Sequence, residues 1–151
     1  TIRSRCVSFA LAPVPEADCA AFCAQQGVDK KTAARLSDLF EGRIGAVLDA
    51  ARDPARGKQL EAAAALAKAA AAGDNYAASV LLAGYEKDKA GASALLRDFC
   101  AYAAAGLRGS KASPLKGEKA ARAIQAAQQA AWQLDRQVNV KIVLQVLAAD
   151  L

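Results

Sequence analysis

The sequence contains no histidine and no methionine, and only 5% of its residues are aromatic. Without histidine, the chain lacks the side chain that most often performs acid–base catalysis near neutral pH. It also has no glycine-rich phosphate loop followed by Lys-Ser or Lys-Thr. The carboxylates are not clustered on one predicted helical face; Asp18, Asp38, Asp49 and Glu86 are spread one or two to a helix. We therefore expect no enzyme activity from this chain by itself.

Long hydrophobic segments are also missing. The longest run without a formal charge, residues 123–134, is too short and too rich in glutamine to span a bilayer. No charged-then-apolar signal segment begins the chain, so we expect a soluble, cytoplasmic protein with no membrane partner. The net charge of +5 permits contact with nucleic acid or with an acidic protein, but it requires neither.

The four cysteines do not form a recognisable metal-binding pattern. Cys19 and Cys23 are four residues apart in a predicted helix, whereas Cys6 and Cys100 are far away in the sequence. A structural zinc site usually combines such a pair with a second pair or with histidines. We weigh a metal site against burial as small apolar residues and favour burial, because reduced cysteine is among the most buried residue types. No metal ligand is predicted.

Alanine supplies much of the apolar fraction of 54%, and alanine favours helices and disfavours strands. We predict an all-α fold with three short helices within residues 13–53, where Asp29 is the N-cap of the second helix and the Asp53-Pro54 pair forms a boundary. Five further helices are predicted at 54–72, 74–87, 89–108, 116–136 and 140–151. The breaker-rich segment 108–117 is expected to be an exposed, mobile loop.

Two stripes of apolar residues stand out in the predicted helices. The first comprises Leu96, Phe99, Cys100, Ala103 and Leu107. The second lies in the last helix, where Asn139 is the expected N-cap, and comprises Val140, Val143, Leu144, Leu147 and Leu151. The second stripe closes the chain and must dock on another element.

The start of the chain has the alternation of a short strand. Val7, Phe9 and Leu11 recur at every second position within residues 6–11. No second strand is predicted anywhere in the chain, and a strand without a partner is not stable. We therefore expect that this strand belongs to a domain preceding the sequence.

Three separated motifs resemble the bacterial clamp-loader family of AAA+ proteins, and within it the C-terminal part of the DNA polymerase III delta-prime type of subunit. The first motif is TIRSRC followed by V-x-F-x-L-x-P, the second is GRIGAVL at residues 42–48, and the third is QVNVKIVL at residues 137–144. The resemblance implies that residues 1–12 end an AAA+ domain. Residues 13–53 would then form a helical lid, and residues 54–151 a five-helix collar that assembles a pentameric ring.

The resemblance also implies a role for the first motif. Ser4, Arg5 and Cys6 correspond to the family's Ser-Arg-Cys motif, in which Arg5 would be an arginine finger for the ATP site of a neighbouring subunit. A guanidinium suits this role because it stays charged and its planar fork matches phosphate oxygens. Ser4 and Cys6 would position the arginine, and no cofactor is expected within this chain because the neighbour binds the ATP. An ordinary surface arginine is the alternative for Arg5.

Within the family, the second motif favours delta-prime over the gamma/tau ATPase subunits. Those motor subunits carry an arginine in the third helix of the AAA+ module that senses their own nucleotide, and the matching position here is Ala46. Arg43 precedes it by about one turn, and a shifted alignment would place Arg43 at the sensor position instead. The third motif departs from the family's N-V-N-P ending at Gln137 and Val140 but keeps Asn139.

The sequence leaves three interpretations open. The leading one is a delta-prime fragment that assembles with gamma/tau and delta subunits and acts indirectly on the sliding clamp and primed DNA. The second is the equivalent fragment of gamma/tau. The third is a helical interaction module unrelated to replication, in which TIRSRC is a coincidence.

Overall fold

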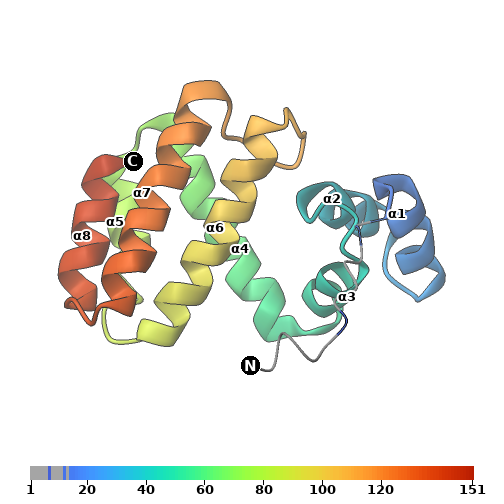
Figure 1. Cartoon of the computed structure of the whole chain (residues 1–151), viewed down its shortest axis with the longest axis horizontal. Coiled ribbons are helices and arrows are strands. Elements are labelled where there is room, and N and C mark those ends of the chain that lie inside the picture. The colour runs from blue at the N-terminus through green and yellow to red at the C-terminus, as the bar shows by residue number, and fades with distance from the viewer. Residues whose placement is uncertain (1–6, 8–11, 13) are drawn as a thin grey trace.

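The computed structural model of the chain describes residues 7, 12 and 14–151, and these residues form an all-α fold (Figure 1). The eight helices of this part of the chain are α1 Glu16–Gln25, α2 Lys30–Leu39, α3 Ile44–Arg52, α4 Pro54–Ala72, α5 Asn75–Ala83, α6 Lys89–Leu107, α7 Gly117–Asp135 and α8 Val140–Asp150. Helices α1–α3 form a small three-helix unit beside a larger five-helix unit, α4–α8. The predicted all-α class is confirmed, while the predicted strand at residues 6–11 lies mainly outside the described residues.

Local side-chain caps explain where most helices begin. Asp29, Asp53, Asp74, Asp88 and Asn139 each precede a helix and accept a hydrogen bond from a backbone amide two or three residues later, at 2.9–3.0 Å. Each cap satisfies an amide that has no partner within its own helix. The predicted caps at residues 29 and 139 are therefore confirmed.

The chain passes from the three-helix unit to the five-helix unit without a connecting loop. Helix α3 ends at Arg52, and α4 begins immediately at Pro54, whose missing N–H is tolerated in a first turn. The side chain of Asp53 caps α4 by accepting from the amide of Ala55 at 2.9 Å. At the other end of α4, Gly73 adopts a left-handed conformation with φ of +72°.

Helix α5 is shorter than the predicted span 74–87. It ends at Ala83, and the following amides of Gly84, Tyr85 and Glu86 bond to carbonyls three residues earlier, at 2.9–3.3 Å. Bonds of this type tighten the chain into a turn and allow it to reverse into α6 at Lys89.

Small side chains dominate the core, as the alanine content predicts. Tyr102 and Phe99 of α6 are the largest fully buried residues, and leucine and alanine supply most of the rest. Alanine lets helix axes approach closely, and α6 packs extensively on both α4 and α7. Of the first predicted apolar stripe, Leu107 in the last turn of α6 is instead 52% exposed, although Ala105 and Gly106 beside it are buried.

The segment 108–117 is not the exposed loop that its composition predicts. Ser113 and Leu115 are buried, and the carbonyl of Leu115 lies against Gly106 of α6. The segment therefore folds back over the end of α6 and belongs to the packed structure. The sequence suggested exposure because serine, lysine and glycine are common in loops, but the buried leucine fixes this loop in place.

This close approach predicts a large effect of a single methyl group. A Cβ at Gly106 would lie 2.3 Å from the carbonyl oxygen of Leu115, so the loop would have to move. We expect Gly106→Ala to lower the free energy of unfolding by about 1–3 kcal/mol, as overpacking does in other cores. The matched control is Gly57→Ala in α4, where the nearest atom would be 3.8 Å away. There, better helix propensity should stabilise the protein by up to about 1 kcal/mol. Urea unfolding measures both, and equal effects would contradict the packing argument.

One buried ion pair joins α4 to α6. Both terminal nitrogens of Arg56 donate to the two carboxylate oxygens of Asp98, whose side chain is 5% exposed. These hydrogen bonds raise the pKa of Arg56, so the guanidinium stays charged. Composition alone does not reveal this pair, because both residue types are usually on the surface.

Candidate interaction surface

The predicted arginine-finger motif, Ser4, Arg5 and Cys6, lies outside the described residues. The second motif is described, and it places Arg43 immediately before the first turn of α3, where its side chain is exposed. Ala46 lies in the first turn of α3 and is half-buried. Helix α3 therefore begins one residue after Arg43. Arg43 and Ala46, the two candidate sensor positions, are almost one helical turn apart.

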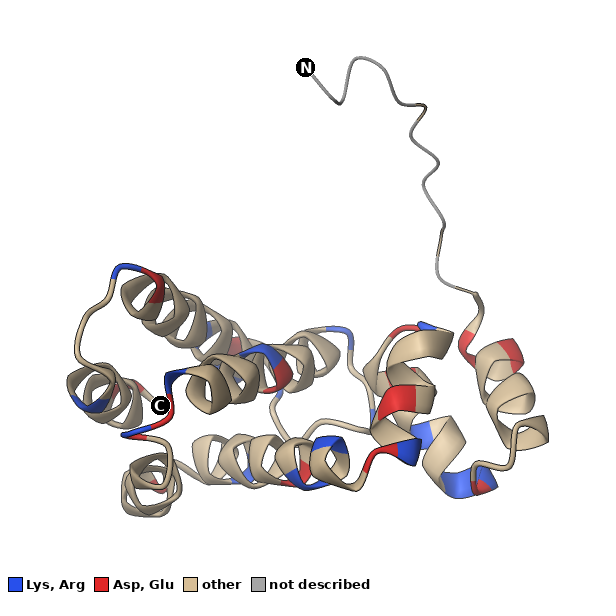
Figure 2. Ribbon diagram, turned by 90° about the horizontal axis from the view of Figure 1, so that it is seen from below, with Lys and Arg blue, Asp and Glu red and all other residues tan. Residues whose placement is uncertain are grey.

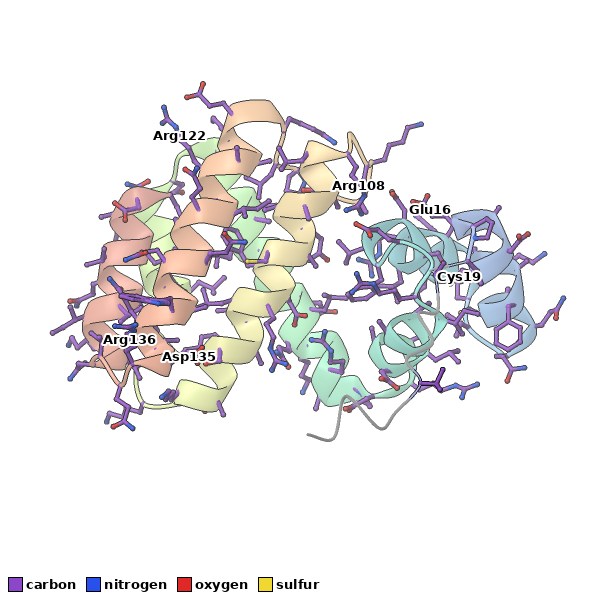
Figure 3. All side chains as sticks on the ribbon, in the orientation of Figure 1. Glu16, Cys19, Arg108, Arg122, Asp135 and Arg136 are labelled. Atoms are coloured by element: carbon purple, nitrogen blue, oxygen red, sulfur yellow. The ribbon has the colours of Figure 1, made fainter. Side chains whose placement is uncertain are left out.

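The cysteines of α1 are buried, as predicted. Cys19 and Cys23 have no exposed surface and lie inside the three-helix unit (Figure 3), while Cys100 is half-buried. Desolvation and the neighbouring Cys19 raise the pKa of Cys23, and desolvation raises the pKa of Cys100. Thiols of this kind are protonated and inert. In the described part of the chain, no three acidic or cysteine side chains gather at a possible metal site.

Lysine, arginine, aspartate and glutamate are mixed along the described helices. Figure 2 shows basic and acidic residues interspersed along both units, without a continuous basic surface in that view. Several basic side chains are paired with neighbours, including Arg122 with Glu118 and Lys141 with Glu86, at 2.8 and 3.6 Å. The modest net charge therefore does not point to a nucleic-acid site.

The outer side of α5 and α8 is the clearest candidate for a functional surface. On α5, Tyr76 is 80% exposed and Val80, one turn later, is 58% exposed. On α8, Ile142 is 56% exposed and Val146, again one turn later, is about half exposed. We call the exposed sides of these two packed helices the α5–α8 face; it comprises these four residues together with Ser79, Ala83 and Gln145, which line the groove between the helices. Exposed apolar side chains at helical spacing, on two packed helices, are typical of a protein–protein contact.

The seven residues that define the α5–α8 face carry no formal charge, although Glu86 also lines the groove between the two helices. Residues 75–83 and 142–149 contain no lysine, arginine, aspartate or glutamate, although 23% of the whole chain is charged. A helix surface that remains in water normally carries charged side chains. Depletion of charge together with exposed aliphatic and tyrosine side chains is the composition found at the centre of interfaces.

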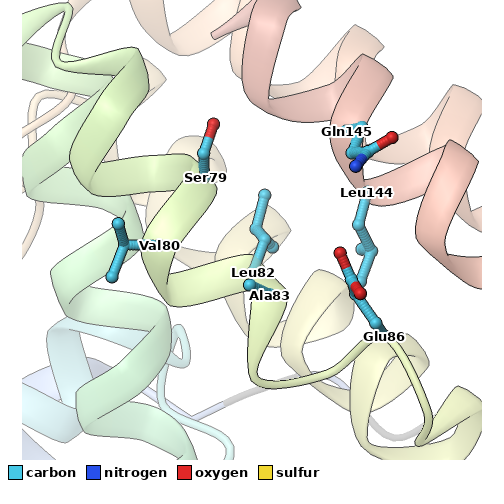
Figure 4. Close-up of a pocket in the computed structure, with 7 residues that line it drawn as sticks. All are labelled: Ser79, Val80, Leu82, Ala83, Glu86, Leu144 and Gln145. Atoms are coloured by element: carbon cyan, nitrogen blue, oxygen red, sulfur yellow. The ribbon is translucent and has the colours of Figure 1, made fainter.

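A groove of about 310 Å³ runs between the two helices of this face (Figure 4). Leu82 and Leu144 lie on opposite walls, and Val80 and Gln145 line the outer part. Polar contacts tie the two helices together at the ends of the groove. Lys141 pairs with Glu86 at 3.6 Å, and the side-chain amide of Asn75 donates to the carbonyl of Ala149 at 3.3 Å. The groove is thus held open by fixed helices and can receive a side chain from a partner.

The α7–α8 corner adds further exposed apolar residues. Trp132 is 51% exposed, and the guanidinium of Arg136 lies 4.1 Å from the centre of its ring. Val138, in the turn before α8, is also exposed. Tryptophan and arginine are the residue types most enriched at energetic centres of interfaces.

Of the closing stripe predicted in α8, Leu144 forms one wall of the groove, and the rest of the stripe does not contribute to this surface. Val143, Leu144 and Leu147 are buried within the chain, where α8 packs on α5 and α7. The stripe therefore docks internally, and the opposite side of α8 is the one left open. The α5–α8 face was not predicted from the sequence, because the apolar periodicity of the closing stripe is stronger than that of the exposed residues. The absence of charge in residues 75–83 and 142–149 is the signal that could have identified it.

Comparison with known proteins adds no assignment, because no protein-family model, curated protein or solved structure matches the chain. Among the described helices, none is long and apolar enough to cross a membrane.

Proposed function

We propose that this chain is the lid and collar region of a clamp-loader subunit of the delta-prime type, and that it assembles with its neighbours through the α5–α8 face. In this role it loads the sliding clamp onto primed DNA only as part of the assembly. It binds no ATP itself; Arg5 reaches the ATP site of a neighbouring gamma/tau subunit.

The order of the two helical units supports this proposal. A three-helix unit precedes a five-helix unit, and the junction at Asp53–Pro54 coincides with the boundary that the resemblance implies. Ala46 supports a delta-prime type over a gamma/tau type, since a methyl group cannot contact a phosphate. The fold by itself does not select a function, because helical bundles serve many.

The uncharged α5–α8 face carries the proposal that this region assembles with other subunits. It lies entirely within the five-helix unit, which corresponds to the oligomerisation domain in the resemblance. A neighbouring subunit offering an apolar helical surface would remove Tyr76, Val80, Ile142 and Val146 from water. Burying four such side chains contributes several kcal/mol at about 25 cal/mol per Å² of apolar area.

A binding experiment with the gamma/tau and delta subunits tests both parts of the proposal. We expect the chain to join a complex with them, and Val80→Glu combined with Ile142→Glu to weaken that complex by roughly 30-fold or more. The reason is that each of the two substitutions places a charge in the dehydrated centre of the interface, where a single substitution commonly costs about 2 kcal/mol of binding free energy. Dissociation constants from interferometry, with the chain immobilised, give the measurement.

The matched control is Leu107→Glu, which changes an equally exposed apolar residue outside the face. It should leave the affinity unchanged, and circular dichroism should be the same for all variants because the substituted positions are exposed. Unchanged affinity of the double variant would reject the α5–α8 face as the interface. Failure of the unsubstituted chain to join any complex would reject the clamp-loader assignment and favour an unrelated interaction module.

A further inference from the structure

The three-helix and five-helix units touch at a second place, distant in sequence from their covalent junction. A carboxylate oxygen of Asp38, in the last turn of α2, accepts from the hydroxyl of Ser110 at 2.7 Å and from the amide of Ala112 at 3.3 Å. Arg108 donates to the backbone carbonyl of Asp38 at 3.2 Å and pairs with Glu41. We call this set, Asp38, Glu41, Arg108 and Ser110, the α2–loop bridge.

The loop side of the bridge is held in shape by its own hydrogen bonds. Gly109 has a φ of +78°, and its amide donates to the carbonyl of Gly106 at 3.2 Å. The amide of Ser110 donates to the carbonyl of Ala105 at 3.0 Å. These bonds close the end of α6 as a left-handed glycine cap. The amino group of Lys116 also donates to the carbonyl of Ser110. The hydroxyl of Ser110 is therefore presented to α2 by a fixed backbone.

The α2 side is equally specific. The carbonyl of Asp38 is one of the last four of its helix, which lack partners within the helix, and Arg108 supplies a charged donor to it (Figure 3). Glu41 has a φ of +54°, a conformation that residues other than glycine seldom adopt. This turn leaves the carboxylate of Glu41 paired with Arg108.

Between the bridge and the covalent junction, the seam is not filled. A cavity of about 280 Å³ lies between α2, α3, α4 and α6, with Thr32, Arg35, Glu61 and Tyr102 among its lining residues. The one hydrogen bond described across it, from Arg35 to the hydroxyl of Tyr102, is 3.5 Å long. Direct helix packing between the units consists mainly of α3 on α4, next to the junction, with a smaller contact of α2 on α6. The cavity beside these contacts leaves room for a change in the angle between the units.

From these observations we propose that the α2–loop bridge is a latch that sets the angle between the three-helix unit and the five-helix unit. With the latch closed, the units are attached at two separated points and cannot rotate about the Asp53–Pro54 junction. With the latch open, that junction acts as a hinge and the cavity provides room for the motion. This inference concerns the chain itself and does not depend on the clamp-loader assignment.

Distance measurements on the isolated chain test the latch. Spin labels introduced through unnatural amino acids at Gln25 of α1 and Gln128 of α7, both exposed, report the separation of the units without using the native cysteines. Pulsed electron paramagnetic resonance should give one narrow distance distribution for the unsubstituted chain. In Asp38→Ala combined with Ser110→Ala, the distribution should shift and broaden while the helical circular dichroism is retained.

The matched control is Glu118→Ala combined with Arg122→Ala, which removes an ion pair within α7 that does not cross the seam. This control should leave the distribution unchanged. If the latch variant loses its cooperative unfolding, the milder Arg108→Gln provides the same test. A broad distribution in the unsubstituted chain, or a narrow one in a folded latch variant, would overturn the proposal.

Discussion

Replacing Arg56 with methionine should lower the free energy of unfolding by about 3–5 kcal/mol, because it leaves the carboxylate of Asp98 buried without its partner. Methionine preserves most of the packing of the arginine stem, so the loss reports the charge rather than a cavity. For a chain of this length the expected decrease in Tm is roughly 10 °C. Urea and thermal unfolding provide the measurement.

Two further variants separate the ion pair from other causes. The double variant Arg56→Met with Asp98→Leu should regain most of the stability, since a buried ion pair replaced by apolar residues of similar volume is often neutral or stabilising. Arg122→Met removes an exposed partner of Glu118 and should change the stability by less than about 0.5 kcal/mol. A double variant as unstable as Arg56→Met would indicate that packing, not charge, is responsible.

On the proposed function, Arg5→Ala in a clamp loader reconstituted with the complete subunit should greatly reduce DNA- and clamp-stimulated ATP hydrolysis while the complex still assembles. In other NTPases an arginine finger contributes on the order of 10³ to 10⁵ in rate, by stabilising charge on the transferred phosphoryl group. The total turnover should therefore lose almost the whole share of the one ATP site that Arg5 completes. Steady-state hydrolysis with a coupled assay measures this loss.

The same segment offers a matched control at Arg3. Arg3→Ala removes an equal charge two residues away and should leave hydrolysis close to that of the unsubstituted loader. Arg5→Lys keeps the charge but loses the planar fork, so it should retain only part of the rate. Unchanged turnover in Arg5→Ala would reject the finger role, whereas failure of all variants to assemble would point to a folding defect.

The helix positions were largely predictable because their signals are local. Asp29, Asp53 and Asn139 each satisfy amides within three residues of themselves, so a cap and the helix that it begins can be recognised in one short window. Gly73 ends α4 for a similarly local reason. The end of α5 at Ala83 was not predicted, because the turn that follows it depends on where α6 must start.

The covered faces were less predictable because burial depends on which helix lies opposite. Leu107 continues the period of a buried stripe, yet it is left in water while Ala105 and Gly106 beside it are buried. Leu115 lies in a polar segment, yet the loop returns to α6 and buries it. Periodicity predicts that a helix has an apolar side, but it does not say how far along the helix the partner reaches.

Only one feature of the candidate surface can be recognised in the sequence; the others depend on the tertiary structure. The lack of charge in residues 75–83 and 142–149 is visible in the sequence, but only the packing of α5 against α8 brings the two segments onto one face. The α2–loop bridge was not visible at all, because its partners are 67 to 72 residues apart and are common surface residue types. Composition and short-range hydrogen bonds thus fix the helices and the all-α class. The exposed apolar face, the buried Arg56–Asp98 pair and the latch arise from contacts between distant segments, which no local pattern encodes.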